Sequence, residues 1–288
     1  MRITLIIPNK QEILQQISRV KDLPPLPSSL ERLLAVVQSQ VTTPEELENI
    51  IHYDQSLTAR VLRVANGAYY GNRGKVTTIS RAIALMGFDQ VKSVCLLALL
   101  LQAFEHGPTL SAAERESLWK HAFCTARLAG RMVERRPWAT REKAYLFGLL
   151  HDLGKLVMLI YFQDYYLALQ DLAREKKVSF RCMELQFGLT HTRLGRWVAV
   201  KWGFPEVFQN VMEFHHTPWE SSSHRPEVKL IALADILANS RNFPDPASHE
   251  IAADCCRDLH VGEDEWEDYR SAVPEVWLEV EHLWRLLS

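Results

Sequence analysis

The sequence predicts an all-α protein. Apolar residues recur at positions i, i+3, i+4 and i+7 through most of the chain, and few segments alternate with the period of two that marks a strand. Many of these stretches begin at a capping residue and end at glycine or proline, which are the start and stop signals of helices. The composition, 47% hydrophobic and 24% charged, is typical of a globular protein, and 288 residues allow one large domain or two smaller ones.

The amino-terminal part is predicted to contain a series of short helices. An apolar stripe at residues 13–20 is followed by the proline-rich segment 23–27, which must run extended until Ser28 or Ser29 caps the next helix. Thr43 opens another helix, because its hydroxyl can cap and it is followed by proline and two acids. Further helices are predicted from Asp54 to Asn66-Gly67, at 79–86 closed by Gly87, and at 90–104.

The break at His106-Gly107-Pro108 is the best candidate for a boundary, because helix-breaking residues are followed there by a new capping sequence. We therefore expect an amino-terminal helical part (1–107), a helical core (108–244) and a carboxy-terminal extension (245–288). Helices beyond the break are predicted at 112–134, 141–159, 164–176, 179–187, 190–201, 205–214, 225–239, 247–258 and 263–287.

The carboxy-terminal extension is acidic, with twelve Asp and Glu against three Arg. Such a run forms either a solvated face or a surface that docks onto a basic partner, and both interpretations stay open at this point. Its last helix carries an apolar stripe that we expect to be packed core rather than a dimer seam. The stripe consists of Val276, Val280, Leu283 and Leu287.

Composition excludes several classes of function. The 33 Lys and Arg against 35 Asp and Glu leave a formal charge of −2, which argues against a dedicated nucleic-acid binder. The longest unbroken apolar run, 94–101, is too short to span a bilayer, so no membrane anchor is expected. The first residues do not resemble a signal peptide, and none of the five cysteines forms a C-x-x-C pair. The sequence therefore predicts a cytoplasmic protein with reduced thiols.

His151-Asp152 lies in the middle of the apolar stretch YLFGLLHDLGKLVMLI. An ionised aspartate there would be costly without a partner or a metal. Adjacent side chains on a helix point about 100° apart, so both can hold one ion only if the ion lies close to the backbone. Gly148 and Gly154 are expected to permit that approach.

Further histidines and an aspartate come from other predicted helices: His121, His191, His215, His216 and Asp235. A single histidine on an apolar face is most often a hydrogen-bonded core residue, but a cluster of imidazoles and carboxylates favours a divalent metal such as iron, manganese, zinc or magnesium. Two aspartates with several histidines could hold two ions. A metal of this kind polarises a phosphate ester. Lys155 is either a phosphate contact or a solvated lysine, and with Asp152 it is a candidate catalytic residue.

The order His121, His151-Asp152 and Asp235 resembles the H…HD…D signature of the HD superfamily, which are all-helical metal-dependent phosphohydrolases. The resemblance implies that these four residues bind metal. His191 and the pair His215-His216 resemble the additional histidines of HD-GYP cyclic-di-GMP phosphodiesterases. The Gly-Tyr-Pro triplet is absent, because HHTPWESSSH follows the pair, so activity on cyclic dinucleotides is not implied.

The amino-terminal part resembles a more specific relative, the HDOD domain, which is an HD-related output domain of bacterial signalling proteins. The resemblance is carried by LPPLP at 23–27 and by the segments 46–71 and 78–100, with small departures at Gln55 and Gly67. It implies an HD-superfamily helical core preceded by a helical HDOD amino-terminal subdomain. Many members of that family lack part of the metal-binding set, whereas this sequence contains all of it.

The sequence therefore predicts two alternative functions. The resemblance to HDOD domains implies a bacterial signal-transduction module that acts through signalling-protein partners, with or without a bound metal. The complete ligand set implies the alternative, a metal-dependent phosphohydrolase or phosphodiesterase acting on a nucleotide or another phosphate ester. Neither nucleic acid nor a membrane is an expected partner in either case.

Overall fold

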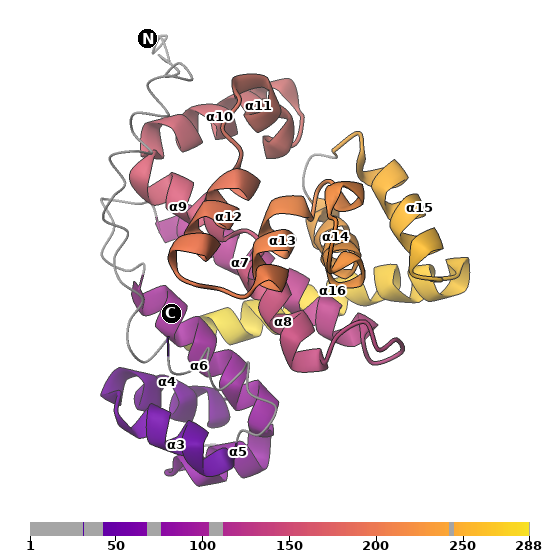
Figure 1. The fold of residues 1–288 in the computed structure, drawn as a ribbon. Coiled ribbons are helices and arrows are strands. Elements are labelled where there is room, and N and C mark those ends of the chain that lie inside the picture. Colours follow the sequence, from indigo (N-terminus) through magenta and orange to yellow (C-terminus); the bar gives the residue numbers. More distant parts are fainter. Residues whose placement is uncertain (1–30, 32–42, 68–75, 104–111, 242–244, 288) are drawn as a thin grey trace. The chain divides into compact units, whose positions relative to one another are not determined.

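The computed structural model describes residue 31 and residues 43–67, 76–103, 112–241 and 245–287, and within them every regular element is a helix (Figure 1). The all-α fold class is therefore confirmed. Apart from residue 31, the expected helices near 13–20 and 28–37 and the break at 106–108 lie outside the described residues. The α-helices are α3 (Pro44–His52), α4 (Gln55–Ala65), α5 (Ile79–Met86), α6 (Phe88–Ala103), α7 (Ala112–Met132), α8 (Arg141–Leu150), α9 (Leu153–Tyr161), α10 (Gln163–Lys176), α11 (Phe180–Phe187), α12 (His191–Lys201), α13 (Glu206–Phe214), α14 (Arg225–Ala238), α15 (Ser248–Asp258) and α16 (Glu263–Leu287).

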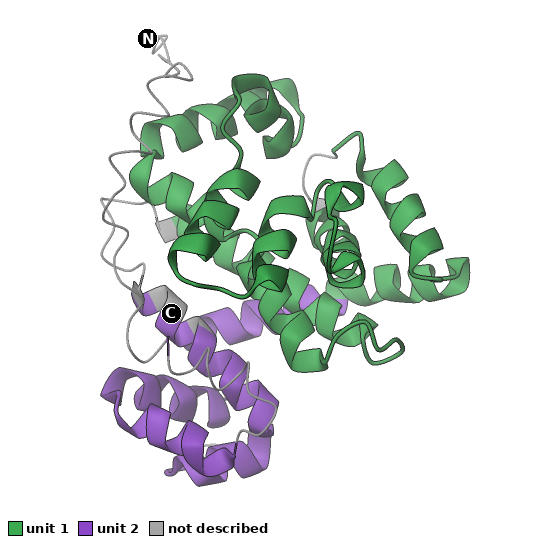
Figure 2. Ribbon diagram, viewed as in Figure 1, with its two compact units in different colours: residues 1–23, 108–274 green, residues 24–107, 275–288 purple. Residues whose placement is uncertain are grey.

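The chain divides into two compact units (Figure 2). Unit 1 consists of residues 1–23 and 108–274, and unit 2 consists of residues 24–107 and 275–288. Helix α16 begins in unit 1 and passes into unit 2 after Pro274, a proline inside the helix. The predicted three-part division of the chain stays a prediction, and the two units are described separately below.

In unit 2, helices α3, α4, α5 and α6 pack on one another. Local signals set their ends as predicted. The Thr43 hydroxyl accepts a hydrogen bond from the backbone N–H of Glu46, whose carboxylate accepts one from the N–H of Thr43, and the two bonds form a capping box. Asp54 caps α4 with a single bond, because its carboxylate accepts a hydrogen bond from the N–H of Leu57, and Gly87 ends α5 with a positive φ of 87°. Each helix then buries its apolar stripe, for example Leu47 and Ile51 of α3.

The end of α16, which belongs to unit 2, carries buried apolar side chains. Val276, Val280 and Leu287 are almost fully buried, so the prediction that this stripe is packed core is confirmed for these three residues. Gly67 lies against Leu286, because a Cβ atom at Gly67 would lie 2.6 Å from the Leu286 Cδ1 atom. The glycine after α4 thus leaves room for this helix.

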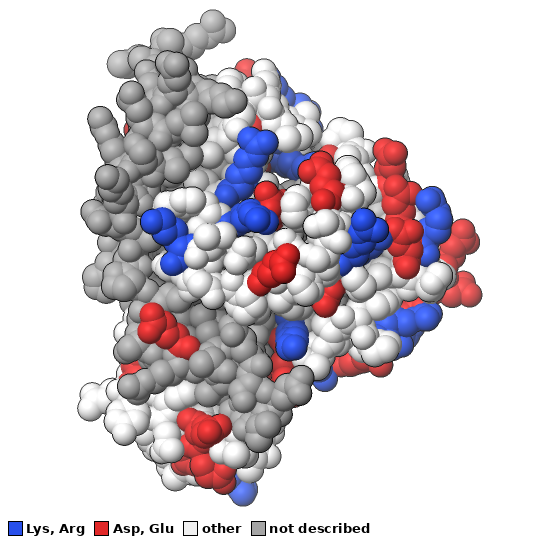
Figure 3. Space-filling model, viewed as in Figure 1, with Lys and Arg blue, Asp and Glu red and all other residues white. Residues whose placement is uncertain are grey.

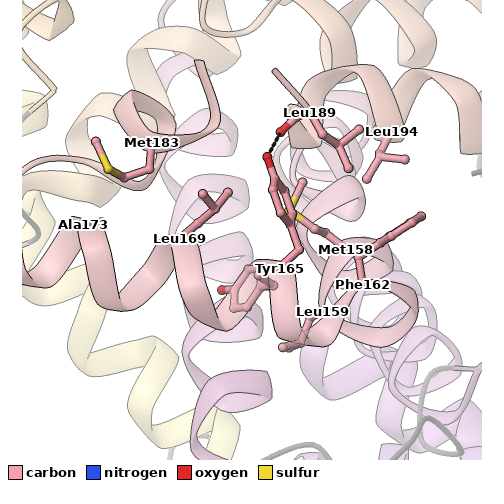
Figure 4. Packing of buried hydrophobic residues seen from close by; sticks show 10 residues of the cluster. Met158, Leu159, Phe162, Tyr165, Leu169, Ala173, Met183, Leu189 and Leu194 are labelled. Atoms are coloured by element: carbon pink, nitrogen blue, oxygen red, sulfur yellow. Dashed lines mark hydrogen bonds between the residues drawn. The ribbon is translucent and has the colours of Figure 1, made fainter. Parts of the chain in front are cut away.

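In unit 1, α7 packs along α8 and α14, and α12 packs along α9 and α13. A hydrophobic cluster joins α9, α10, α11 and the start of α12, with Leu159 and Leu169 fully buried in it (Figure 4). The buried Tyr165 keeps its hydroxyl satisfied by donating a hydrogen bond of 3.3 Å to the carbonyl oxygen of Leu189. This packing holds α9, which follows His151-Asp152, and α12, whose first residue is His191.

The prediction of one continuous helix over 141–159 is wrong. Helix α8 ends at Leu150 and α9 starts at Leu153, and His151 and Asp152 form the turn between them. The apolar pattern runs unbroken through both helices, so periodicity does not reveal the turn. The turn places both side chains at one point, with His151 Nε2 3.4 Å from Asp152 Oδ2.

The expected role of the two glycines is also wrong. A Cβ atom at Gly148 would lie 2.5 Å from the Cα atom of Ala126 in α7. A Cβ atom at Gly154 would lie 1.9 Å from the carbonyl oxygen of His191 in α12. The space beside each glycine is therefore filled by the backbone of another helix, and the glycines permit close helix packing instead of the approach of an ion.

Among the described residues, the stretch Arg141–Tyr161 is apolar and long enough to cross a membrane by length and composition alone. However, 89% of its most apolar part is buried inside the structure. The stretch consists of α8, the His151-Asp152 turn and α9, so packing within unit 1 accounts for its apolar character.

Several acids of the carboxy-terminal extension pair with basic residues of the same unit. Within unit 1, Asp245 contacts Arg181 at 3.1 Å, and Asp258 contacts Lys229. Two more ion pairs, Glu265 with Arg136 and Asp268 with Arg135, are each 2.9 Å long. Part of the acidic run thus forms ion pairs within unit 1. On the face shown in Figure 3, basic and acidic side chains are interspersed.

Candidate metal centre

Five segments of unit 1 bring the predicted site residues together. Helix α7 supplies one histidine, the turn between α8 and α9 supplies the His-Asp pair, and the first residue of α12 is a histidine. The His-His pair directly follows α13, and α14 supplies the second aspartate. These residues, nearly all of them buried, are His121, His151, Asp152, His191, His215, His216 and Asp235.

Asp152 lies in the middle of the cluster. Its Oδ1 atom is 3.2 Å from His191 Nε2 and 3.7 Å from His215 Nε2. Its Oδ2 atom is 3.4 Å from His121 Nε2 and 2.7 Å from the Lys155 Nζ atom. One carboxylate thus faces ring nitrogens from three helices or their ends and a lysine one turn further along its own chain.

Asp235 forms the second centre of negative charge. Its Oδ1 atom is 2.9 Å from His121 Nε2 and 3.5 Å from His151 Nε2, and its Oδ2 atom is 3.6 Å from His216 Nδ1. Asn239, one turn later on the same face, donates a hydrogen bond of 2.7 Å from Nδ2 to Asp235 Oδ1. The two aspartates are therefore linked through the rings of His121 and His151.

The histidine rings are oriented by acceptors outside the cluster. His151 donates from Nδ1 to the carbonyl oxygen of Gly148 at 2.6 Å, and His215 donates from Nδ1 to the carbonyl oxygen of Val211 at 3.0 Å. A carbonyl oxygen can only accept, so each Nδ1 carries a proton and each Nε2 atom is turned toward the aspartates. Metal-binding histidines are held in this way.

The residues fit a divalent metal, because the cluster leaves buried polar atoms without hydrogen-bond partners. These atoms include Nε2 of His151, Oδ1 of Asp152 and Nε2 of His216. His191 Nε2 and His215 Nε2 also lie only 3.4 Å apart, close enough for both atoms to contact one ion. Unpartnered buried groups are costly, and a cation between them would remove that cost.

The ligand atoms group in threes that suit metal coordination, each set lying within 4.8 Å of one another. Imidazole nitrogen and carboxylate oxygen together are ligands for iron, manganese, zinc and magnesium. The sets are His121, His151 and Asp235; His151, Asp152 and His215; and His191, His215 and His216.

The charge states of the two aspartates and of His215 suit cation binding, whereas His151 carries a proton that a metal would have to displace. Burial alone would raise the pKa of Asp152, but the positive charges on His151 and Lys155 hold the pKa of that carboxyl well below its usual range. Burial likewise opposes ionisation of Asp235, yet the nearby His121 and His151 lower its pKa strongly. Burial lowers the pKa of His215 to about 3, so that imidazole is neutral. For His151, burial lowers the pKa and Asp152 raises it, with a net rise to about 10.

Two residues that contact the cluster were missed by sequence reasoning, Glu184 and Asn239. Glu184 is fully buried in α11, where its carboxylate accepts a hydrogen bond of 2.6 Å from His191 Nδ1. The signal for it was available, because an acid stands between Phe180 and Phe187 at helical spacing. Asn239 follows Asp235 by four residues, which is the spacing of neighbours on one helix face.

Unit 1 is all-α and contains a buried cluster of histidines and aspartates from five segments. These features place the protein in the class of helical domains with a candidate metal site. The family follows from comparison with known proteins. The family model of the HDOD domain matches residues 23–218, and the chain belongs to this family.

Solved structures share the fold at low sequence identity. An HDOD domain protein of unknown function from Geobacter sulfurreducens is 24% identical with a TM-score of 0.79, covering 94% of this chain and 96% of that one. A candidate signal transduction protein from Marinobacter aquaeolei VT8 is 19% identical with a TM-score of 0.78, covering 98% and 68%. A candidate phosphohydrolase from Shewanella amazonensis SB2B is 20% identical with a TM-score of 0.72, covering 95% and 98%.

A curated relative, described as an uncharacterized protein of Treponema pallidum (strain Nichols), is 24% identical over 249 residues. The match covers 81% of this chain and 47% of the relative, so the chain spans about half the length of the curated relative it matches.

Proposed function

We propose that this chain is a bacterial signal-transduction module of the HDOD family that binds a divalent metal in unit 1 and acts through signalling-protein partners. Membership of the family supports the signalling role, as does the likeness in fold to a protein described as a candidate signal transduction protein. One observation carries the metal site: the buried Nε2 and Oδ1 atoms of His151 and Asp152 face the cluster without hydrogen-bond partners.

The ligands of the proposed site are the two aspartates and the imidazole nitrogens near them, which are Nε2 atoms except in His216, whose Nδ1 lies nearer to Asp235. Asp152 and Asp235 would supply the negative charge, and His121 and His151 lie between the two carboxylates. His191, His215 and His216 form a second group, in which His191 and His215 face Asp152 Oδ1 and His216 faces Asp235. The metal, when bound, supplies a positive charge that satisfies these groups.

The proposal is tested by metal analysis of protein purified without chelators. We expect stoichiometric iron, manganese or zinc in the wild-type protein and loss of that metal in Asp152→Asn, which keeps the shape of the side chain and removes its charge. Asp171→Asn is the matched control, because Asp171 is exposed on α10 and contacts only Arg174 among the ion pairs of the described residues. Wild-type protein with only trace metal would overturn the proposal.

A second candidate function is metal-dependent hydrolysis of a nucleotide or another phosphate ester. It is favoured by Lys155, whose ammonium group lies 2.7 Å from Asp152 Oδ2, next to the proposed metal ligands. The side chains of Lys155 and His216 keep 14% and 15% of their surface exposed, so this edge of the cluster is not sealed. In this function Lys155 would bind a phosphate oxygen and orient the ester, while Asp152 holds the Lys155 ammonium group in place.

Hydrolysis of bis(p-nitrophenyl) phosphate in the presence of Mn²⁺ or Fe²⁺ distinguishes the two functions. If the protein is an enzyme, turnover follows the metal content, and Lys155→Ala loses turnover while it retains metal. Stoichiometric metal without turnover on phosphate esters favours the signalling module.

A further inference from the structure

We infer that Glu184 is a positioning residue for the proposed metal centre, where it sets the tautomer and the orientation of His191. This inference rests on the proposed metal binding and extends it to a residue outside the ligand set. Its basis is a pair of hydrogen bonds that join one buried carboxylate to one residue.

Glu184 and His191 are both buried, with 0% and 1% of their surface exposed. Glu184 Oε2 accepts a hydrogen bond of 2.6 Å from His191 Nδ1, and Glu184 Oε1 accepts one of 2.7 Å from the backbone N–H of His191. An ionised carboxylate can only accept, so both groups of His191 are donors. The two bonds fix the imidazole ring relative to the first residue of α12.

The Nδ1–H tautomer of His191 leaves Nε2, on the opposite edge of the ring, available to bind a metal. With the proton on Nδ1, a neutral His191 has a free electron pair on Nε2, which lies 3.2 Å from Asp152 Oδ1 and 3.4 Å from His215 Nε2. His151 and His215 obtain the same tautomer from neutral backbone carbonyls. Only His191 among these three is held by a full negative charge, which makes its Nε2 atom the more basic ligand.

A purely structural role does not account for this arrangement. The start of α12 already has its cap, because the Thr190 hydroxyl accepts a hydrogen bond from the N–H of Arg193. A fully buried carboxylate costs free energy that an apolar side chain of the same size would not cost. Its placement is explained by the ring that it orients.

Glu184→Gln distinguishes a structural role of Glu184 from its positioning of the His191 ring, because glutamine keeps the shape of the side chain. The backbone N–H of His191 can only donate, so it would take the amide oxygen of the new side chain. The amide NH₂ group would then face Nδ1 of His191 and require it to accept. The proton would move to Nε2, and the ring could no longer bind a metal through that atom.

The experiment is titration of metal-free protein with Co²⁺, following the visible absorption bands of the bound ion and the affinity by competition with a chelator. We expect Glu184→Gln to bind Co²⁺ about 10- to 100-fold more weakly, with altered bands that reflect the lost imidazole ligand. Glu184→Asp, which keeps the charge on a shorter side chain, should recover part of that affinity. Glu213→Gln is the matched control, because Glu213 on α13 pairs with Arg196 outside the cluster.

A double-mutant cycle tests whether Glu184 acts through His191. In a His191→Ala background, Glu184→Gln should cause no further loss of Co²⁺ affinity, since the ring that it orients is gone. Equal additional loss in both backgrounds would overturn the inference, as would unchanged affinity in the single variant.

A measurement on the wild-type protein keeps the inference testable if the variants do not fold. In the Zn²⁺-loaded protein, long-range ¹H–¹⁵N correlation spectra should show His191 protonated on Nδ1 and metal-bound through Nε2. Protonation on Nε2 would overturn the positioning role while leaving metal binding intact. Failure of the wild-type protein to bind either ion would overturn the proposed function, and the inference with it.

Discussion

At the scale of single residues, the negative charges of buried carboxylates in the candidate centre are compensated by protonated neighbouring side chains. Asp152 and Asp235 remain ionised because neighbouring positive charges lower their pKa against the effect of burial. His151 supplies one of these charges in the metal-free protein, since its pKa is raised to about 10 by the two aspartates although burial opposes this. A metal that binds His151 must therefore displace a proton.

The metal affinity should rise with pH from 7 to 9. Below pH 10 His151 is protonated in the metal-free protein, so each unit of pH makes its proton easier to displace, by up to about tenfold in the binding constant. Chelator competition with Zn²⁺ at pH 7, 8 and 9 measures the effect, after correction for the pH dependence of the chelator. A flat affinity over this range would mean that His151 is already neutral before the metal binds.

Gly154→Ala should destabilise unit 1 and weaken metal binding. A Cβ atom at this position would lie 1.9 Å from the His191 carbonyl oxygen, so α9 and α12 must move apart, at a cost of about 1 to 3 kcal/mol. Chemical denaturation of the metal-free variant measures the first effect and Co²⁺ titration the second.

Gly130→Ala is the matched control for this prediction. Gly130 also lies within a helix, but a Cβ atom there would meet its nearest neighbour, the Arg141 side chain, at an ordinary 3.8 Å. The control should be neutral or more stable by up to about 1 kcal/mol, because alanine favours the helix. Equal stability of the two variants would contradict the close packing at Gly154.

At the scale of helices, capping residues couple the local stability of a helix to the site that it carries. Thr140 caps α8 and Thr190 caps α12, each through a hydroxyl that accepts a backbone hydrogen bond. The two helices differ in where their site residue lies. His191 is the first residue of α12, whereas His151 follows the last residue of α8.

Thr140→Ala and Thr190→Ala should therefore have equal effects on stability and different effects on metal binding. Each variant loses a cap, at a cost of about 1 kcal/mol in the free energy of unfolding. Only Thr190→Ala loosens the turn that holds His191, so only this variant should bind Co²⁺ more weakly. Equal Co²⁺ affinities in the two variants would show that Glu184 alone holds the start of α12.

The same helices indicate what could be predicted from the sequence. The ends of α3, α4, α5 and α12 depend on local hydrogen bonds of Thr, Asp and Gly, which can be recognised in a single sequence. The turn between α8 and α9 depends instead on tertiary packing, because Gly148 and Gly154 meet the backbones of α7 and α12. No pattern within residues 141–161 contains that information.

At the scale of the whole molecule, the site also has a part that the sequence predicts and a part that depends on the folded chain. The order of histidines and aspartates resembled the HD signature, and that resemblance indicated which residues belong together. Spacing alone could not, because the seven residues come from five segments of unit 1. Glu184 was missed because its role depends on which ring it meets in the folded chain, although its position on an apolar face could have marked it.

All seven proposed ligands lie within residues 108–274, so metal binding should stabilise unit 1 selectively. A ligand at 100 times its dissociation constant stabilises the unit that binds it by about 2.7 kcal/mol, equal to roughly 100-fold slower exchange of amides that open only when that unit unfolds. Hydrogen–deuterium exchange with Zn²⁺ or with EDTA measures this segment by segment. We expect protection in α7, α8, α12 and α14 and no change in α3, α4 and α5, with Asp152→Asn showing no metal effect anywhere. Equal protection in α3 to α5 would mean that the two units unfold as one.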